Sequence, residues 1–375
     1  MENNNQKKFR EMLTGVVSDK AIDLLAPLIP DGPAGETAVV TLAGAVKAMP
    51  KGMDPQTMRD TIVKQLSTKK KEHDAQEGDK PASSKALVRK YYDSMMIELR
   101  LMDPVEPTME KEIFGETFPT PIMTAALSHL SPYKPGEIGL LERYAMAAKE
   151  VGCLHFVGMC ENDQFASIMN VGAKTVRIVK PYADEAKIFD HIRFAQEAGA
   201  FAIGMDIDHA ITSTGDVDIA MSERMDRKSL AQMKSYVEAT KLPFIFKGVL
   251  SVRDALLCKE IGAKGILVSH HGGRISYSAP PALLLPEIRK AVGDDMVILV
   301  DCGITSGMDA YKAMALGADG VCVGTHLIPY LRQGGEAAVV KRMNEMTLEL
   351  KGAMSFTAVK NCEDFDPTVI HFRSF

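Results

Sequence analysis

The sequence predicts an α/β fold, a (β/α)8 TIM barrel that follows an N-terminal helical extension. From residue 119 onward, eight short apolar runs alternate with amphipathic stretches, and polar residues end several of these runs. Buried parallel strands read as short apolar runs, and the helices that connect them are amphipathic. The repeating part covers about 225 residues, close to the roughly 250 residues usual for such a barrel. A doubly wound open sheet is the alternative, but the near-regular units favour a closed barrel.

The first 85 residues differ from the rest and form the predicted extension. Residues 5–29 have a helical period that ends at a Pro-Asp-Gly-Pro break, and further helices are expected around 35–48 and 55–67. Residues 67–85 are almost wholly polar, which is typical of a linker or a solvated face. We therefore predict two parts: a helical extension with its linker over 1–85, and the barrel with a C-terminal helix over 86–375.

The predicted barrel strands follow one another at regular intervals. In chain order they are 120–126, 153–158, 174–179, 200–208, 243–248, 264–269, 296–301 and 319–324. Amphipathic helices are predicted between them at 139–150, 184–198, 229–239, 252–261, 283–291 and 307–316. Gly-Ala pairs precede several of the strands, as expected where a helix ends and a tight turn follows.

The composition is that of an ordinary globular protein, with 46% hydrophobic and 25% charged residues. A net charge of −5 argues against a nucleic-acid binder, which would carry a basic face. The polar N-terminus does not resemble a signal peptide, and no apolar run reaches the roughly eighteen residues of a membrane span. The six cysteines never fall in a C-x-x-C spacing, so we expect buried thiols in a cytoplasmic protein.

Polar residues at the strand ends are the candidate catalytic groups. Asp206, Lys247 and Asp301 each end a predicted strand, and another strand runs into His270 and His271. The carboxyl ends of barrel strands meet at one mouth, where active sites lie. Such a residue can also be a simple helix cap, and for Asp301 alone the two interpretations are balanced. Lys247 and His271 together favour a functional site.

The segment 243–325 carries a specific set of motifs. They are a strand ending in Lys-Gly at 247–248, S-H-H-G-G-R at 269–274, a D-C-G turn at 301–303 and G-A-D-G-V-C-V-G at 317–324. In these motifs the chain resembles the FMN-dependent α-hydroxy acid dehydrogenases and oxidases, the family of glycolate oxidase, L-lactate oxidase and mandelate dehydrogenase. A weaker likeness begins at 118–126 and ends at 349–358. The resemblance implies a TIM barrel with FMN that oxidises an α-hydroxy acid or a related small anion.

The resemblance also implies roles for individual residues. His271 corresponds to the catalytic base and Asp206 to the carboxylate that orients its imidazole. Arg274 corresponds to the arginine that grips the substrate carboxylate, and Lys247 to the lysine that stabilises the reduced flavin. His271, Arg274 and Arg177 are the expected substrate contacts, and no metal site is expected. The expected cofactor contacts are Thr124, Ala125, Ala126, Gly158, Arg177, Lys247, Ser269, Asp301, Gly303, Thr305, Gly324 and Thr325.

Two departures from the family pattern concern the phosphate of the cofactor. Thr305 and Thr325 stand where the family has phosphate-binding arginines. Each charge-assisted hydrogen bond lost would weaken binding by about 1.5–3 kcal/mol. His326, Lys312 or backbone groups alone are the candidates to hold the phosphate instead.

Further departures concern the substrate and the flavin ring. Val179 stands where the family has a substrate-contacting tyrosine, and Arg177 where it has a flavin-contacting glutamine. Arg177 either supplies positive charge to an anionic substrate from a new direction or pairs with a local carboxylate. Residues 208–228 form a polar insertion that is a candidate lid over the mouth. His270 replaces an asparagine and is expected to pack beside the site.

Two functions remain open beside the oxidoreductase. The type 2 isopentenyl-diphosphate isomerases share much of this motif set and use reduced FMN without net oxidation, but they need a basic diphosphate pocket. A non-catalytic flavin-binding barrel is the other, and the retained catalytic set argues against it. For the oxidoreductase we expect a small anionic substrate, an electron acceptor that is oxygen, a quinone or a protein, and a homo-oligomer.

Overall fold

The computed structural model divides the chain into two compact units, Met1–Lys80 and Pro81–Phe375. The described residues are 4–26, 29, 39, 42–43, 46–47, 49, 53–58, 60–61 and 83–373. Most of the helices expected around 35–48 and 55–67, and of the linker expected at 67–85, lies outside the described residues. Helix α5 (Ser84–Ser94) opens the second unit, so that unit includes the end of the segment assigned above to the extension.

The first unit has its own small apolar core. Helices α1 (Asn4–Leu13) and α2 (Asp19–Leu25) take the place of the helical segment expected over 5–29; α1 begins one residue earlier, and a turn separates the two helices. Ser18 caps α2 by accepting a hydrogen bond from the backbone of Ala21 at 3.4 Å. The buried side chains of this core are Phe9, Leu13, Ala21, Ile22, Leu25, Ala26, Ile29, Val39, Leu42, Ala43, Val46 and Met58.

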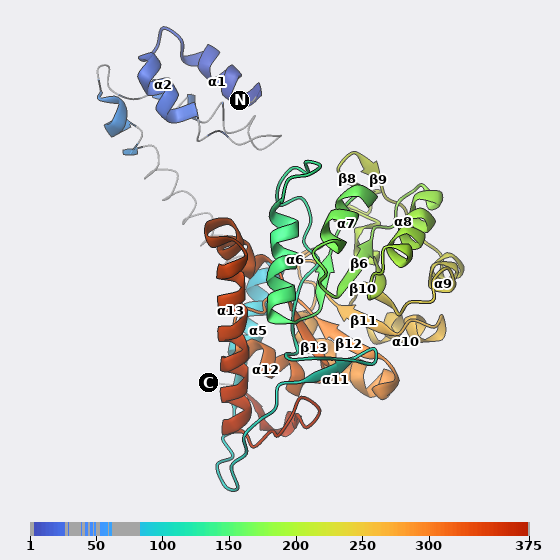
Figure 1. Cartoon of the computed structure of the whole chain (residues 1–375). Helices are drawn as coiled ribbons and strands as arrows, with labels where there is room; N and C mark the ends of the chain where they lie inside the picture. Colours follow the sequence, from blue (N-terminus) through green and yellow to red (C-terminus); the bar gives the residue numbers. More distant parts are fainter. Residues whose placement is uncertain are drawn as a thin grey trace. The chain divides into compact units, whose positions relative to one another are not determined.

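The second unit is the predicted barrel, and all eight strands form one parallel sheet (Figure 1). The strands are β4 (Ile122–Thr124), β5 (His155–Val157), β6 (Thr175–Val179), β7 (Ala202–Asp206), β10 (Phe244–Val249), β11 (Gly265–Val268), β12 (Val297–Val300) and β13 (Gly320–Val323). Their order is β4-β13-β12-β11-β10-β7-β6-β5. The backbone of Thr124 donates to Leu154 at 3.3 Å and Leu127 bridges to Val157, so β4 also meets β5 and the sheet closes.

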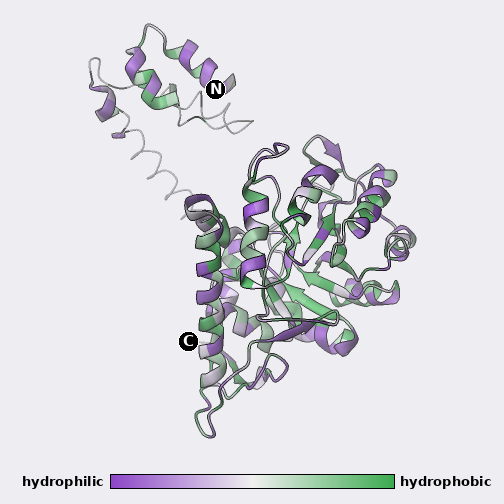
Figure 2. Cartoon of the chain, viewed as in Figure 1, coloured by the Kyte–Doolittle hydropathy of each residue, from purple (hydrophilic) through white to green (hydrophobic). Residues whose placement is uncertain are grey.

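Helices cover the outside of the barrel (Figure 1). They are α6 (Leu140–Val151), α7 (Asn162–Met169), α8 (Glu185–Glu197), α9 (Leu230–Glu238), α10 (Val252–Glu260), α11 (Pro281–Val292), α12 (Gly307–Ala315) and α13 (Ile328–Phe356). Figure 2 shows apolar strands surrounded by helices with one apolar and one polar face, the pattern expected when both faces of the sheet are buried. Within the described part of the chain, every helix is too short or too polar to cross a membrane.

Side chains that point into the barrel form a core separate from the one beneath the helices. Its strand residues include Met123, Phe156, Val176, Ile178, Ala202, Ile245, Leu267, Leu299 and Cys322. Because alternate residues of a strand face the same side, this set fixes which strand-end residues point inward. All six cysteines are free thiols, and all but Cys302 are buried.

A hairpin that the sequence did not suggest covers the amino ends of the strands. Strands β2 (Lys111–Ile113) and β3 (Glu116–Phe118) pair antiparallel. Ile113 and Phe118 join the core inside the barrel, and the Phe118 ring packs edge-on against Phe201, just before β7. The hairpin therefore closes the amino end and leaves the carboxyl end for ligands.

The remaining elements surround the mouth and the edge of the barrel. Strand β1 (Met95–Ile97) pairs antiparallel with β14 (Ile370–Phe372) and ties α5 to the C-terminal segment. The loop after β7 contains the short helix η2 (Ile207–His209) and the hairpin of β8 (Ile219–Ala220) and β9 (Glu223–Arg224). This loop is the segment expected to be a lid.

Candidate active site

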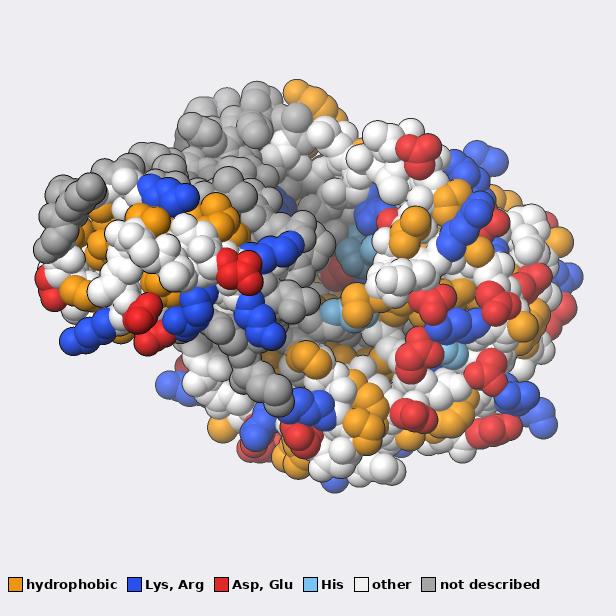
Figure 3. Space-filling view, turned by 90° about the horizontal axis from the view of Figure 1, so that it is seen from above, with side chains coloured by type: hydrophobic (Ala, Val, Ile, Leu, Met, Phe, Trp, Pro, Cys, Tyr) orange, Lys and Arg blue, Asp and Glu red, His pale blue; other side chains and the backbone are white. Residues whose placement is uncertain are grey.

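A cavity of about 570 Å³ lies at the carboxyl ends of the barrel strands. Small-molecule sites generally have volumes of roughly 300–1,000 Å³. Figure 3, seen from above, shows histidine side chains inside a hollow of this face. The predicted site residues that line the cavity are Ala125, Ala126, Lys247, His271, Asp301, Gly303, Thr305, Gly324 and Thr325.

Strand register brings Asp206 and Lys247 together. The two residues are partners in the parallel pairing of β7 with β10, and they share the inward phase of Ala202 and Ile245. Both are buried, and Asp206 Oδ2 lies 3.5 Å from Lys247 Nζ. Burial alone would raise the pKa of Asp206, but Lys247, Lys180 and His271 outweigh it and hold that pKa well below its ordinary range.

His271 is placed by a tight turn after β11. Its φ is 55°, and Gly272 and Gly273 follow with φ of 78° and 110°, so three consecutive residues have a positive φ. Ser269 shapes this turn, because its Oγ accepts a hydrogen bond from the His271 backbone at 3.1 Å. The turn brings Nδ1 of His271 to 3.0 Å from Nζ of Lys247.

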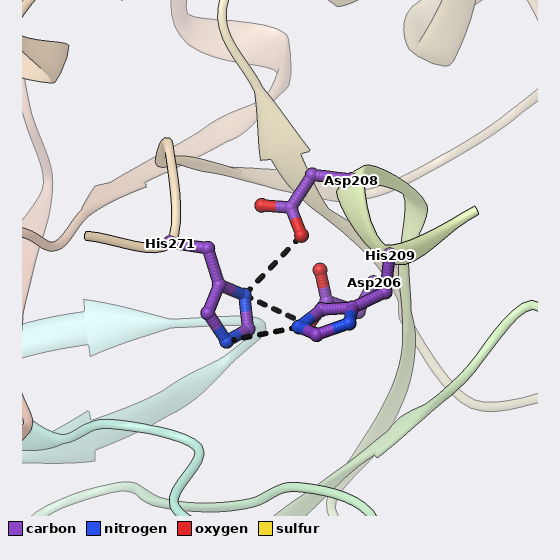
Figure 4. Close-up of side chains that lie close together, drawn as sticks. All are labelled: Asp206, Asp208, His209 and His271. Atoms are coloured by element: carbon purple, nitrogen blue, oxygen red, sulfur yellow. Dashed lines mark hydrogen bonds and ion pairs between the residues drawn. The ribbon is translucent and has the colours of Figure 1, made fainter. Parts of the chain in front are cut away.

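Two carboxylates also face Nδ1 of His271. Asp206 Oδ2 lies 3.3 Å away and Asp208 Oδ1 3.2 Å away (Figure 4). Burial would lower the pKa of His271, but hydrogen bonds to both carboxylates outweigh it and raise that pKa. Burial and the charge of Asp206 raise the pKa of Asp208. Neighbouring carboxyl groups with pKa values shifted in opposite directions are typical of acid–base sites.

The loop after β7 covers the other side of His271. His209 Nε2 lies 3.2 Å from His271 Nε2, and the two rings meet edge-on (Figure 4). Asp218 then links His209 to Arg274: its Oδ2 lies 3.0 Å from His209 Nδ1 and accepts a hydrogen bond from Arg274 Nη2 at 2.6 Å. Arg274 also donates to the carbonyl of Ile211 at 2.7 Å. The loop thus contacts both the imidazole of His271 and the guanidinium of Arg274, two of the predicted catalytic residues.

The side chains of Asp206, Asp208, His209 and His271 have possible metal-ligand atoms within 4.8 Å of one another. However, Lys180 and Lys247 already place two ammonium groups beside Asp206, at 2.7 and 3.5 Å. Positive charge at this distance opposes binding of a cation. The two ammonium groups therefore disfavour a metal ion at this cluster.

Arg177 is not brought to the cavity. Its guanidinium lies between the sheet and the helices, stacked over the Phe165 ring at 4.5 Å. It donates to Asn162 Oδ1 at 2.7 Å and to the carbonyl of Cys160 at 3.0 Å. Of the two roles open from the sequence, the geometry favours a local structural one, with an amide and carbonyls as partners instead of a carboxylate.

The phase of β6 also changes which residue faces the mouth. Val176 and Ile178 point into the barrel, so Arg177 and Val179 point outward and the next inward position is Lys180. Lys180 is buried and donates to Asp206 Oδ2 at 2.7 Å. The sequence analysis placed Val179 at the position of a substrate-contacting tyrosine, but in the structure Val179 points away from the barrel interior and Lys180 points into it. Because β6 is buried on both faces, its sequence carried no clear signal of this phase.

Thr124 and Gly158, both expected to contact the cofactor, lie beside the cavity instead of lining it. Thr124 Oγ1 is 2.7 Å from Nδ1 of the buried His155 and accepts a backbone hydrogen bond from Phe156 at 3.2 Å. The Gly158 backbone donates to the carbonyl of Leu127 at 3.0 Å, and a Cβ at this position would lie 3.1 Å from that oxygen. These residues hold β4 and β5 together behind the cavity wall.

The loop after β12 forms the floor of the cavity. Cys302 and Gly303 have φ of 69° and 80°, and the Cys302 thiol donates to Asp301 Oδ1 at 2.9 Å. His270, expected to pack beside the site, lines the cavity. Within the described residues, both of its ring nitrogens are buried without a hydrogen-bond partner. His270 therefore offers unused polar atoms to a ligand.

At the far end of the cavity, Thr305 and Thr325 are joined by cationic groups that sequence reasoning missed. Lys85 and Arg89 of α5 line the wall, and Arg89 Nη1 lies 3.5 Å from Thr305 Oγ1. Arg89 is also held by Asp309 at 2.9 Å. Arg89 stands 216 residues before Thr305 in the chain, so the sequence gave no signal that the two side chains meet.

Of the two side chains considered as replacements for the missing arginines, one reaches the cavity. His326 lines it and accepts a hydrogen bond from Arg342 Nε at 3.2 Å. Lys312 instead donates to the carbonyl of Tyr92 at 2.9 Å and lies outside the lining.

Comparisons with known proteins identify related sequences. The model of a family described as FMN-dependent dehydrogenase matches residues 65–235 and 214–372. A 2-hydroxyacid oxidase of Dictyostelium discoideum is 40% identical over 132 residues, 35% of this chain and 34% of that protein. A 4-hydroxymandelate oxidase of Amycolatopsis orientalis is 29% identical over 302 residues, 71% of this chain and 83% of that protein.

Similarity to solved structures extends over most of the barrel. A mandelate oxidase variant solved with a monooxide FMN adduct has a TM-score of 0.68 and 27% identity, and the match covers 79% of this chain and 93% of that one. The chain spans about a third of the length of the first curated relatives it matches, for example 38% of an L-lactate dehydrogenase of Caulobacter vibrioides.

Proposed function

The chain belongs to the FMN-dependent dehydrogenase family, and on this premise we propose that it is an FMN-dependent oxidoreductase that oxidises an α-hydroxy acid or a related small anion. The observation that carries the proposal is the pair His271 and Lys247 in the cavity lining, with the buried carboxylate of Asp206 in contact with both. A histidine with a raised pKa beside a buried carboxylate is suited to take and hold a proton.

The residues of the cavity fit FMN. Its volume suits a ligand of that size, and the unpartnered nitrogens of His270 offer hydrogen bonds to a polar ring edge or a ribityl chain. Lys247 would place a positive charge beside the flavin ring. Lys85, Arg89 and His326 would hold the phosphate in place of the two family arginines.

The proposed reaction oxidises the hydroxyl-bearing carbon of the substrate to a carbonyl. His271 would take the hydroxyl proton at Nε2, while Asp206 and Asp208 at Nδ1 stabilise the imidazolium that results. FMN, when bound, supplies the acceptor for the hydride, two electrons and one hydrogen, that leaves the substrate carbon. We expect oxygen, a quinone or a protein to take those electrons from the holoenzyme.

Arg274 is proposed to bind the substrate carboxylate through a charge-assisted hydrogen bond. In the structure its Nη2 is held by Asp218 and Ile211, and His271 Nε2 faces His209. A substrate must therefore displace Asp218 and His209 before it can make both contacts. This makes the loop of residues 208–228 the proposed lid.

The proposal is tested by the visible absorption spectrum of the purified protein and by the mass of the released chromophore. We expect bound FMN whose absorbance is bleached anaerobically by one or more members of a panel of 2-hydroxy acids. Bound FMN that none of them reduces would contradict the oxidoreductase and favour the isomerase. A protein that is colourless and cannot be reconstituted with FMN would favour a barrel that has lost its cofactor.

A further inference from the structure

Lys180 is a buried cation to which the proposed reaction gives no role. It directly follows β6, it points inward with Val176 and Ile178, and it is 6% exposed. Burying an ammonium group is costly unless a partner compensates it, so its presence at the mouth calls for a specific contact. That contact is Asp206.

Three nitrogen atoms share a single oxygen of Asp206. Lys180 Nζ lies 2.7 Å from Oδ2, His271 Nδ1 lies 3.3 Å away and Lys247 Nζ 3.5 Å away. The shortest of these contacts, and so the strongest hydrogen bond, is that of Lys180. Asp206 Oδ1 is buried without a hydrogen-bond partner among the described residues. Asp206 is therefore directed toward Lys180 more than toward the imidazole that it would orient.

The charges around the site are balanced in pairs. Two ammonium groups, Lys180 and Lys247, face two carboxyl groups, Asp206 and Asp208. Burial lowers the pKa of Lys180, and the negative charge of Asp206 offsets part of that effect. Lys247 already pairs with Asp206 at 3.5 Å, so the second ammonium group changes how strongly that carboxylate can act on His271.

We propose that Lys180 is a positioning residue for His271: it holds Asp206 ionised and draws Oδ2 away from Nδ1, which limits how tightly the imidazole retains a proton. The inference rests on the proposed function, in which His271 must be unprotonated to accept the substrate proton. A base is most effective when its pKa lies near the working pH, and this limit keeps His271 available there. 

Charged and titratable groups surround both His271 and Lys180. Asp206 of β7, Asp208 and His209 of η2 and Lys247 of β10 face His271. Asp206, Asp208, Lys247, His129 and His209 act electrostatically with Lys180. Loss of the ammonium group lets Oδ2 approach Nδ1 more closely than 3.3 Å and also removes a positive charge, and both changes favour the imidazolium. The pKa of His271 should therefore rise.

The test is a pH titration of His271 by NMR in the FMN-loaded protein with isotope-labelled histidine, the signal being assigned with His271→Gln. In Lys180→Met we expect the His271 pKa to rise by about one unit, a tenfold gain in proton affinity. Lys180→Arg keeps the charge and should leave the value near that of the wild type. The matched control is Lys174→Met, at the opposite end of the same strand, where the side chain is 54% exposed and pairs with Glu116.

An unchanged or lower His271 pKa in Lys180→Met would overturn the proposal, as would an equal rise in Lys180→Arg. If Lys180→Met does not fold with FMN, Lys180→Gln keeps a hydrogen-bond donor without the charge and should shift the pKa in the same direction. The titration requires no turnover. A wild-type flavin that no 2-hydroxy acid reduces would therefore reject the proposed function while the effect of Lys180 on His271 is still measured.

Discussion

Replacing Asp218 by Asn should increase the affinity of the site for carboxylates. Asp218 holds the guanidinium of Arg274 at 2.6 Å, and a bound substrate must break this contact. The two side chains are 15% and 27% exposed, respectively, so the contact is neither a free surface pair nor a fully buried one. A charge-assisted hydrogen bond contributes about 1.5–3 kcal/mol, and solvent reduces this for a partly exposed pair to about 1 kcal/mol. Removing that competition corresponds to an approximately fivefold lower dissociation constant.

The assay is the change in the flavin spectrum when a non-oxidisable dicarboxylate such as oxalate is titrated into the FMN-loaded protein. Asp216→Asn is the matched control, because Asp216 lies on the same loop, is exposed, and accepts its side-chain hydrogen bond from Thr214. We expect tighter binding in Asp218→Asn and unchanged binding in Asp216→Asn. Equal or weaker binding in Asp218→Asn would show that Arg274 does not receive the carboxylate, and the reasoning about the lid would fail.

Three further predictions follow from the site and the core. His271→Gln should keep FMN bound but slow its reduction by a 2-hydroxy acid by about 10²–10⁴-fold in stopped-flow measurements, since the proton acceptor is lost; a normal rate would remove the base from this residue. Lys85→Met should weaken binding of FMN by roughly fivefold and leave binding of riboflavin, which has no phosphate, unchanged. Lys90→Met, on the exposed side of the same helix, should change the binding of neither ligand. Burial lowers the pKa of His155 from its ordinary value of 6.5 to about 3. Below pH 6.5 the unfolded chain therefore binds this proton more readily than the folded chain does. The melting temperature should fall as the pH drops from 6.5 toward 4, and His155→Gln should make it less dependent on pH.

The fold could be predicted because its signals are local. Strands such as β11 and β12 are covered on both faces, so their sequences G-I-L-V and V-I-L-V are apolar throughout and stand out between amphipathic helices. The strand-end residues Asp206, Lys247 and His271 were identified for the same reason, since a polar group that interrupts an apolar run is visible without knowledge of the packing.

The sequence could not predict which residues of a fully buried strand point into the barrel, or which residues far apart in the chain come into contact. Arg177 in β6 and Lys180 directly after it are both buried, so burial alone does not show which of them points into the barrel. Only the inward positions of Val176 and Ile178 decide it. Lys85 reaches the cavity because α5 packs near the mouth, beside residues that lie far from it in the sequence. The pairing of Asp218 with Arg274 depends on the conformation of a loop, which periodicity does not describe.

The hairpin of β2 and β3 has a practical consequence for handling the protein. Because it seals the amino end of the barrel, a chemical tether attached there would leave the mouth turned toward solution. Thr117 on this hairpin is exposed, while five of the six native thiols are buried, so a cysteine introduced by Thr117→Cys would be the preferred point of coupling to a surface. Immobilised through this position, the flavin site would face the reactant stream and not the support.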